Sequence, residues 1–297
     1  MLAIKNVHET VGGEVGALFE GGDVQLDELE REEILDILQT SGYILFRSSD
    51  VDMPRFTAMV ERVSSRISLD PARNFHSNVA QKVDAGTDPV GLHCENGNSP
   101  FWPDLAWFYC ERAATSGSQT TVCDGEQVWA ALGDTAREMF TRHDIVYSRR
   151  VSEQQWKDYV YHSREGKLPR ADITLDHLRA LMNDTSTATI DPLDGGAICY
   201  RFRTPAARTG RFSGRVAFAN SILGPSYNYE VPVITLDSGE PIPAEIMAEI
   251  TQVTGVLTSE VTWKNGDLLL IDNTRVMHGR RAIVDTRRTI YNALSYV

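Results

Sequence analysis

The strongest constraint on the fold is a series of short β-rich segments that begins near Gly91 and continues along the rest of the chain. Gly, Asn, Asp and Pro, the residues that favour turns, separate these segments. Such a series favours a barrel or sandwich over an alternating β-α-β array. The predicted strands are Leu105–Arg112, Thr120–Asp124, Ile145–Val151, Ala197–Thr204, Arg215–Ile222, Glu260–Lys264, Asp267–Asn273 and Arg288–Val297.

The N-terminal part of the chain has a different pattern. Leu26–Ser41 has a helical hydrophobic period and ends at Gly42. Tyr43–Ser48 is predicted as a strand and Pro54–Val63 as a second helix. We therefore expect an α+β chain in which a helical N-terminal layer covers a β-core with loop and helix insertions. The inserted helices are predicted at Gly125–Leu132, Gln154–Tyr161, Leu175–Met182 and Ala244–Val256.

No repeat, low-complexity tract or Pro/Gly/Ser-rich linker divides the sequence, so residues 1–297 are expected to form one domain. Two irregular segments, Ser152–Pro192 and Thr204–Glu230, are longer than most connections. They are expected to act either as lids over a substrate or as ordinary surface excursions.

Charge and cysteine usage limit the partners and the compartment. The formal net charge is −12, so we expect the chain to repel nucleic acid and anionic membrane surfaces unless it carries a strong local basic patch. Neither a signal peptide nor an apolar run of membrane-spanning length is recognisable. The four cysteines form no CxxC pair, which is typical of free thiols in a reducing compartment. We expect a cytoplasmic protein without a nucleic-acid or membrane partner.

His93 and Glu95 form an HxE pair that follows Gly91 and precedes an Asn-Gly turn. In an extended strand, residues two apart point to the same face, so the imidazole and the carboxylate lie side by side. This spacing suits two ligands of one metal ion, although the same pattern is found at ordinary polar strand edges.

His278 supplies a third ligand of the same kind. It is expected in the loop that follows the apolar segment Asp267–Asn273 and ends at Arg280. Two histidines and one carboxylate that leave coordination positions open are typical of non-haem Fe(II) oxygenases. The same donor set also suits zinc.

Two adjacent arginines precede the last predicted strand. A guanidinium there can bind the far carboxylate of an anionic cosubstrate through two parallel hydrogen bonds. We favour Arg288 over Arg287 because two-residue alternation puts Arg288 on the same face as Ile290.

The order of these motifs is specific. HxE at His93 and Glu95 is followed by T-S-G-S-Q-T at Thr115–Thr120, by W-x-x-G-D-x-L-x-x-D-N-x-x-x-x-H-G-R at Trp263–Arg280, and by R-R-x-I at Arg287–Ile290. From about Pro89 onward the chain therefore resembles the Fe(II)/2-oxoglutarate-dependent taurine dioxygenase-like superfamily. The resemblance implies a double-stranded β-helix, or jelly roll, as the core.

The resemblance also implies roles for individual residues. His93, Glu95 and His278 would bind Fe(II), Arg288 would bind the distal carboxylate of 2-oxoglutarate, and Thr120 would assist it. The implied reaction consumes O2 and hydroxylates, desaturates or cyclises at an unactivated C–H bond, with release of succinate and CO2.

Glu95 is a departure, because most of the superfamily has Asp there and Glu is typical of the clavaminate synthase-like branch. It directs the substrate expectation toward a small, polar, amino-acid-like molecule, free or tethered to a carrier protein, in natural-product biosynthesis. It also argues against halogenation, since the halogenases of the superfamily replace this carboxylate with Gly or Ala.

Other candidates for substrate contact are less specific. Asn292 stands where sulfonate-binding relatives have an Arg, which argues against taurine as the substrate. Arg203, Asn220 and Tyr227 lie on or beside predicted strands and could contact a polar substrate, but an ordinary strand-edge role is the favoured interpretation of each.

Two different classes of protein remain as alternatives. A zinc-dependent hydrolase could use the same His2Glu site, but it would need a separate general base and has no use for the arginine. A non-enzymatic jelly-roll binding protein would not need to keep all three ligands and the arginine. Anaerobic titration with Fe(II) and 2-oxoglutarate separates the three classes.

Overall fold

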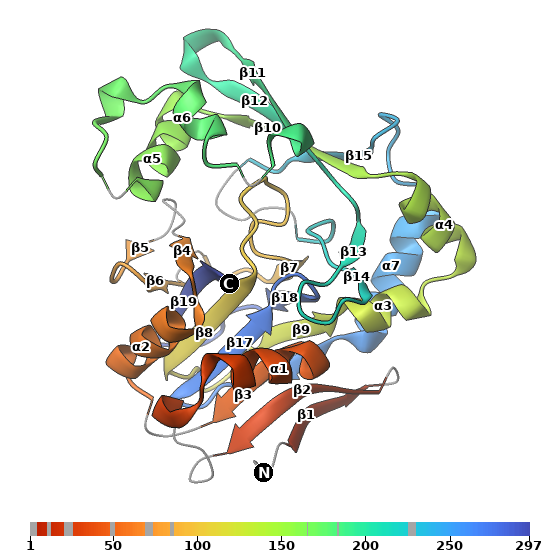
Figure 1. The fold of residues 1–297 in the computed structure, drawn as a ribbon. Coiled ribbons are helices and arrows are strands. Elements are labelled where there is room, and N and C mark those ends of the chain that lie inside the picture. Colours follow the sequence, from red (N-terminus) through yellow and green to blue (C-terminus); the bar gives the residue numbers. More distant parts are fainter. Residues whose placement is uncertain are drawn as a thin grey trace.

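The computed structural model describes residues 5–10, 13–20, 26–47, 51–68, 74–83, 86–164, 166–182, 184–224 and 230–297. A large sheet and a smaller sheet lie at its centre, with a third sheet beside them (Figure 1). The large sheet has the strand order β1 (Lys5–Thr10), β2 (Gly13–Glu20), β3 (Tyr43–Arg47), β17 (Asp267–Asp272), β8 (Leu105–Arg112), β19 (Thr289–Tyr296), β6 (Gln81–Lys82) and β5 (Asn74–Phe75), and β4 (Arg66–Ser68) pairs with β19.

The smaller sheets complete the β-structure. The second sheet has the order β16 (Ser259–Val261), β9 (Thr120–Asp124), β18 (Val276–Arg280) and β7 (Val90–His93). The third has the order β11 (Ala188–Pro192), β12 (Ile198–Thr204), β10 (Ile145–Val151) and β15 (Val233–Leu236), and β13 (Ala207–Thr209) forms a two-stranded ribbon with β14 (Val216–Phe218). All eight predicted strands overlap an observed one, so the β-rich reading of the sequence is confirmed.

Helices cover the outside of the sheets. In Figure 1, α1 and α2 lie along the large sheet, and α5 and α6 accompany the third sheet. The α-helices are α1 (Arg31–Ser41), α2 (Met53–Val63), α3 (Gly125–Ala131), α4 (Asp134–Arg142), α5 (Glu153–Ser163), α6 (Leu175–Arg179) and α7 (Ala244–Leu257). Short 3-10 turns are present at Leu26–Glu28, Arg170–Asp172, Thr185–Thr187 and Asp194–Gly196.

Side chains that alternate along the large sheet belong to two different core layers. Leu268 and Leu270 pack with the buried faces of α1 and α2, whereas Leu269 and Ile271 pack with side chains of the second sheet. The alternation follows from the two-residue period of a strand, which is buried here on both sides. The space between the two sheets is therefore an apolar interior, and every polar side chain that points into it needs an explanation.

The N-terminal layer is not only helical, as the sequence analysis expected. Strands β1 and β2 precede α1 and extend the large sheet, with β2 parallel to β3 from Ala17↔Ile44 to Glu20↔Arg47. The segments that form them are polar or glycine-containing, and their strand character comes from pairing, of β2 with β3 and of β1 with β2, rather than from local pattern.

The helices predicted within residues 152–192 are present. Residues 152–192 carry α5 and α6, which overlap the predictions at Gln154–Tyr161 and Leu175–Met182, and also β11, which was not predicted. Helix α4 was missed, although Ala136 and Phe140, four residues apart, are both buried on its inner face. Among the described residues, no helix is long and apolar enough to cross a membrane.

Candidate functional site

The two histidines of the candidate site lie opposite each other on neighbouring strands. His278 is in β18 and pairs with His93 at the end of β7, and their ring centroids are 4.6 Å apart. The expectation of a loop at His278 is therefore wrong. The segment Val276–Arg280 is a fully buried strand because it pairs on both sides, with β9 and β7.

Gly279, between His278 and Arg280, allows the close approach of these strands. A Cβ atom at this position would lie 2.5 Å from the backbone oxygen of Val90. Any other residue would push β7, and with it His93, away from β18. The glycine of the HGR motif thus has a packing reason.

Glu95 lies just beyond the strand that carries His93. β7 ends at His93, Glu95 begins a turn, and Asn96 has a φ of 55°, in the left-handed region. The i, i+2 strand geometry expected for the pair is therefore incomplete. Even so, one ligand atom from each of His93, Glu95 and His278 lies within 4.8 Å of the others.

The backbone of Glu95 is held by a side chain distant in the sequence. The Asn273 carboxamide accepts a hydrogen bond from the Glu95 N–H at 2.8 Å and donates to the Glu95 C=O at 3.0 Å and to the Pro103 C=O at 2.8 Å. Trp102 Nε1–H donates to the Asn273 C=O at 3.1 Å. This contact takes the place of the strand pairing that Glu95 lacks. Asn273 belongs to the D-N motif, but nothing in the sequence pattern indicated its partner.

The ring nitrogens are arranged as metal ligands need. His93 Nδ1 lies 2.9 Å from the Gly91 carbonyl, and donation to this acceptor leaves the lone pair on Nε2. His278 is 3% exposed, its Nε2 lies 3.5 Å from Glu95 Oε1, and neither of its nitrogens has a hydrogen-bond partner in the described part of the chain. Unsatisfied buried nitrogen is costly, and a cation between the two histidines and the carboxylate would remove that cost at Nε2 of His278.

Two buried arginines, Arg280 and Arg288, lie near each other in the same interior. Arg288 is 8% exposed and donates to the Val83 carbonyl at 3.2 Å, and Arg280 donates to the carbonyls of Asp88 and Gly86. Burial, and secondarily the charge of Arg280, lowers the pKa of Arg288 to about 10. A group whose protonated form is disfavoured in this way attracts an anion. Arg280 was not assigned a role from the sequence, although it stands two residues after His278 on the same strand face.

The partners of Arg287 and Thr120 show which of these two residues is available to an anion in the interior. Arg287 is exposed and forms a two-point ion pair with Asp285, at 2.8 and 3.0 Å. Thr120 is buried on β9 opposite Arg280, and its Oγ1 accepts a hydrogen bond from Trp263 Nε1 at 3.0 Å. The Thr120 hydroxyl hydrogen can therefore be donated to an anion beside Arg280. Trp263, the first residue of the W-x-x-G-D motif, had been given no role.

The less specific substrate candidates lie elsewhere. Arg203 is exposed on β12 and pairs with Asp144 at 3.5 Å. Asn220 is fully buried, and its carboxamide donates to the Ala206 carbonyl and accepts from the Ile222 N–H, so its role is structural. Tyr227 lies outside the described residues.

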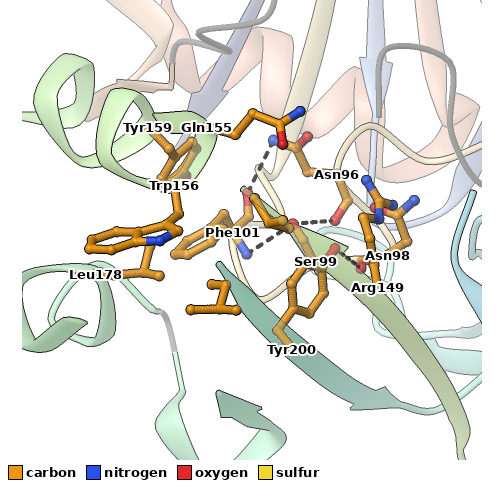
Figure 2. Close-up of a pocket in the computed structure, with 12 residues that line it drawn as sticks. Asn96, Asn98, Ser99, Phe101, Arg149, Gln155, Trp156, Tyr159, Leu178 and Tyr200 are labelled. Carbon is orange, nitrogen blue, oxygen red and sulfur yellow. Dashed lines mark hydrogen bonds between the residues drawn. The ribbon is translucent and has the colours of Figure 1, made fainter. Parts of the chain in front are cut away.

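A small pocket of about 110 Å³ lies beside the loop that follows Glu95. Figure 2 shows Trp156, Tyr159 and Leu178 at one end, and Asn96, Asn98 and Arg149 at the other. Arg149 is buried, with its guanidinium carbon 5.8 Å from the Tyr200 ring centre. An aromatic wall combined with a buried cation is typical of a small-molecule site.

Comparison with known proteins agrees with this geometry. Residues 3–294 match the family model described as taurine catabolism dioxygenase TauD, TfdA family. A clavaminate synthase-like protein of Arabidopsis thaliana is 25% identical over 292 residues, which cover 90% of this chain and 85% of that protein. The dapdiamide synthesis protein DdaC of Enterobacter agglomerans is 21% identical over 286 residues, which cover 87% and 84%.

A solved structure shows the same fold at lower identity. PvcB of Pseudomonas aeruginosa superposes with a TM-score of 0.63 at 12% identity, covering 99% of this chain and 90% of that chain. PvcB is described as an Fe, alpha-ketoglutarate dependent oxygenase from an isonitrile synthetic pathway.

Proposed function

Because the chain belongs to the TauD/TfdA family of dioxygenases, we propose that it oxidises an unactivated C–H bond of a small, polar, amino-acid-like substrate. The enzyme depends on Fe(II), 2-oxoglutarate and O2. When bound, these groups supply the oxidising power for C–H cleavage and release succinate and CO2. The zinc hydrolase and the non-enzymatic binding protein are set aside by the family membership.

One observation carries the assignment of residues. One ligand atom from each of His93, Glu95 and His278 lies within 4.8 Å of the others. The same buried interior contains the neighbouring arginines Arg280 and Arg288. In our proposal the three residues bind Fe(II), with the two histidines on adjoining strands and Glu95 held by Asn273. Three protein ligands leave positions open for cosubstrate and O2.

The cosubstrate site is proposed at Arg288. Its guanidinium would bind the distal carboxylate of 2-oxoglutarate, with the Thr120 hydroxyl as a second donor. Arg280 adds positive charge and is anchored by backbone carbonyls, so it can remain in place while the cosubstrate enters and leaves. An anion here offsets the repulsion between two buried guanidinium groups.

The surrounding fold would keep water away from the reacting carbon. The Phe108 ring lies 5.2 Å from the His278 ring and walls the metal site on the side of the large sheet. The pocket beside residues 96–101 would receive the part of the substrate remote from the oxidised carbon, with α5 and α6 as its outer wall. We further propose that the two central sheets form a double-stranded β-helix and that residues 1–297 form one domain.

The substrate class rests on weaker support. The dapdiamide and isonitrile relatives act in biosynthetic routes by their descriptions, and a clavaminate synthase-like protein is among the relatives, the branch for which Glu at this position is typical. We propose a natural-product intermediate with amino-acid character, free or bound to a carrier protein.

Anaerobic titration tests the proposal directly. Adding 2-oxoglutarate to the Fe(II) protein should produce a weak visible charge-transfer band, and free amino acids or carrier-tethered amino acids should stimulate succinate release in air. A protein that shows no band and hydrolyses esters or amides with zinc instead would contradict the proposal. Stimulation by sulfonates but by no amino acid would contradict the substrate class alone.

A further inference from the structure

The side chain of Asn292 is an unexplained polar group in the interior. It is 0% exposed, and neither Nδ2 nor Oδ1 has a hydrogen-bond partner anywhere in the described ranges. Burying an amide without partners is unfavourable, and native interiors keep such groups for a reason. The interior thus holds a donor group, the Nδ2 amide, and an acceptor atom, Oδ1, that are both unpartnered on the same side chain.

The position of Asn292 puts this amide near the metal site. On β19, Ile290 and Leu294 face the space between the two sheets, and Asn292 has the same parity. Its cross-strand neighbour on β8 is Phe108, whose ring centre lies 5.2 Å from the ring centre of His278. Residues paired across strands have Cβ atoms about 5 Å apart. The Asn292 amide therefore lies beside Phe108, which in turn packs against the proposed metal ligand His278.

Arg288 lies just before the other end of this strand, since β19 begins at Thr289. Four residues of a strand span roughly 13 Å, which separates a cationic end at Arg288 from a neutral end at Asn292. A carboxylate next to Asn292 would satisfy Nδ2 but would bring negative charge toward Oδ1. A group that both accepts and donates satisfies both atoms.

We propose that Asn292 recognises a carboxamide, or a group with the same donor and acceptor pair, on the oxidised substrate. This inference rests on the proposed function and narrows its substrate class. Asn292 selects against sulfonates and carboxylates because a neutral amide provides no counter-charge for a buried anion. The cosubstrate, whose charge is met at Arg288, does not depend on it.

The first test needs no substrate. Asn292→Leu replaces the amide by an apolar group of similar size, so the free protein should melt at a higher temperature than the wild type. Asn220→Leu is the matched control, because Asn220 is equally buried but has both amide atoms hydrogen-bonded, and this variant should melt at a lower temperature. If Asn292→Leu melts at a lower temperature or is unchanged, the amide is already satisfied inside the protein and the proposal is wrong.

The second test compares three probes that differ only in the terminal group, namely β-alaninamide, β-alanine and taurine. With the anaerobic Fe(II) and 2-oxoglutarate protein, the wild type should bind β-alaninamide at least tenfold more tightly than the two anions, as read from the perturbed absorption band. Asn292→Leu should abolish this preference without changing the affinity for 2-oxoglutarate. A tenfold difference corresponds to about 1.4 kcal/mol.

The outcomes separate this inference from the proposed function. A wild type without any 2-oxoglutarate-dependent band contradicts the proposed function, while the melting comparison still reports on the amide. A normal band with no preference for β-alaninamide overturns the role of Asn292 alone. Weaker 2-oxoglutarate binding in Asn292→Leu also overturns it, because the amide would then serve the cosubstrate.

Discussion

The Asn273 side chain binds both the N–H and the C=O of Glu95, so the residue that follows β17 fixes the backbone of a proposed metal-site residue on another part of the chain. The two residues meet only in the folded protein. Their contact replaces the two hydrogen bonds that a partner strand would otherwise give Glu95. Orientation of the carboxylate, rather than its mere presence, is therefore a property of the tertiary structure.

Asn273→Ala should weaken metal binding about 10- to 100-fold, the range found when residues that orient metal ligands are removed. Isothermal titration with Mn(II) or Co(II) measures this. Asn220→Ala is the control, since its buried amide is hydrogen-bonded to the backbone of Ala206 and Ile222 and not to Glu95. If both variants lose stability and retain equal metal affinity, Asn273 has only a structural role.

His278→Ala should abolish turnover and most iron binding while the fold persists, because a two-ligand site cannot hold Fe(II) tightly. Succinate release and bound iron after gel filtration report the two effects, and far-UV circular dichroism reports the fold. His177→Ala, which removes only a cap contact at α6, should keep full activity. Residual turnover of a tenth or more in His278→Ala would mean that the ligand assignment is wrong.

Arg288→Ala should cost about 2 to 5 kcal/mol of 2-oxoglutarate binding, the usual effect of removing one member of a buried charge pair. The apparent affinity from succinate release at varied 2-oxoglutarate measures the loss. Arg287→Ala should leave that affinity unchanged, because Arg287 is exposed and paired with Asp285. The reverse result would transfer the role to Arg287.

Wild-type enzyme should give no chlorinated product in the presence of chloride. In the proposed site, Glu95 would provide a protein oxygen at the position where halide would have to bind, so no site would be open for halide while cosubstrate and O2 are bound. Mass spectrometry of the product with chloride present and absent checks this. A chlorinated product would show that Glu95 does not remain bound to the metal.

Asp272 should make the protein less stable as the pH rises from about 4 to 7. Its Oδ1 accepts two hydrogen bonds from Thr274, and burial raises the pKa of its carboxyl to about 7. A carboxyl group whose pKa is higher in the folded than in the unfolded protein stabilises the fold at pH values below its unfolded pKa. This stabilisation is lost as the pH rises through the folded pKa. Asp272→Asn should reduce the dependence of the urea unfolding midpoint on pH between about 4 and 7.

Asp285 gives the opposite sign and serves as the control for that experiment. Hydrogen bonds from Arg287 and Thr115 lower the pKa of Asp285, so its contribution is present at neutral pH and is lost in acid. Asp285→Asn should therefore destabilise at pH 7 and make no difference at low pH. Parallel pH profiles for wild type and Asp272→Asn would contradict the assignment to Asp272.

The sequence alone determined the residue types of the site and most of the elements that carry them. The HxE pair, the HGR motif and Arg288 were all recognisable, because metal and carboxylate binding require particular donor groups in short motifs. Strand segments such as Asp267–Asp272 were also recognisable, because burial on both faces demands an unbroken apolar run.

The tertiary structure alone decided which of these groups meet. Strand β18 became a strand through pairing with β7 and β9, and this pairing set His278 opposite His93. The Asn273 contact with Glu95 and the unpaired amide of Asn292 depend on which sheet each strand joins. A local pattern records the period of one segment, whereas hydrogen bonds and burial across sheets depend on the register between segments far apart in the chain.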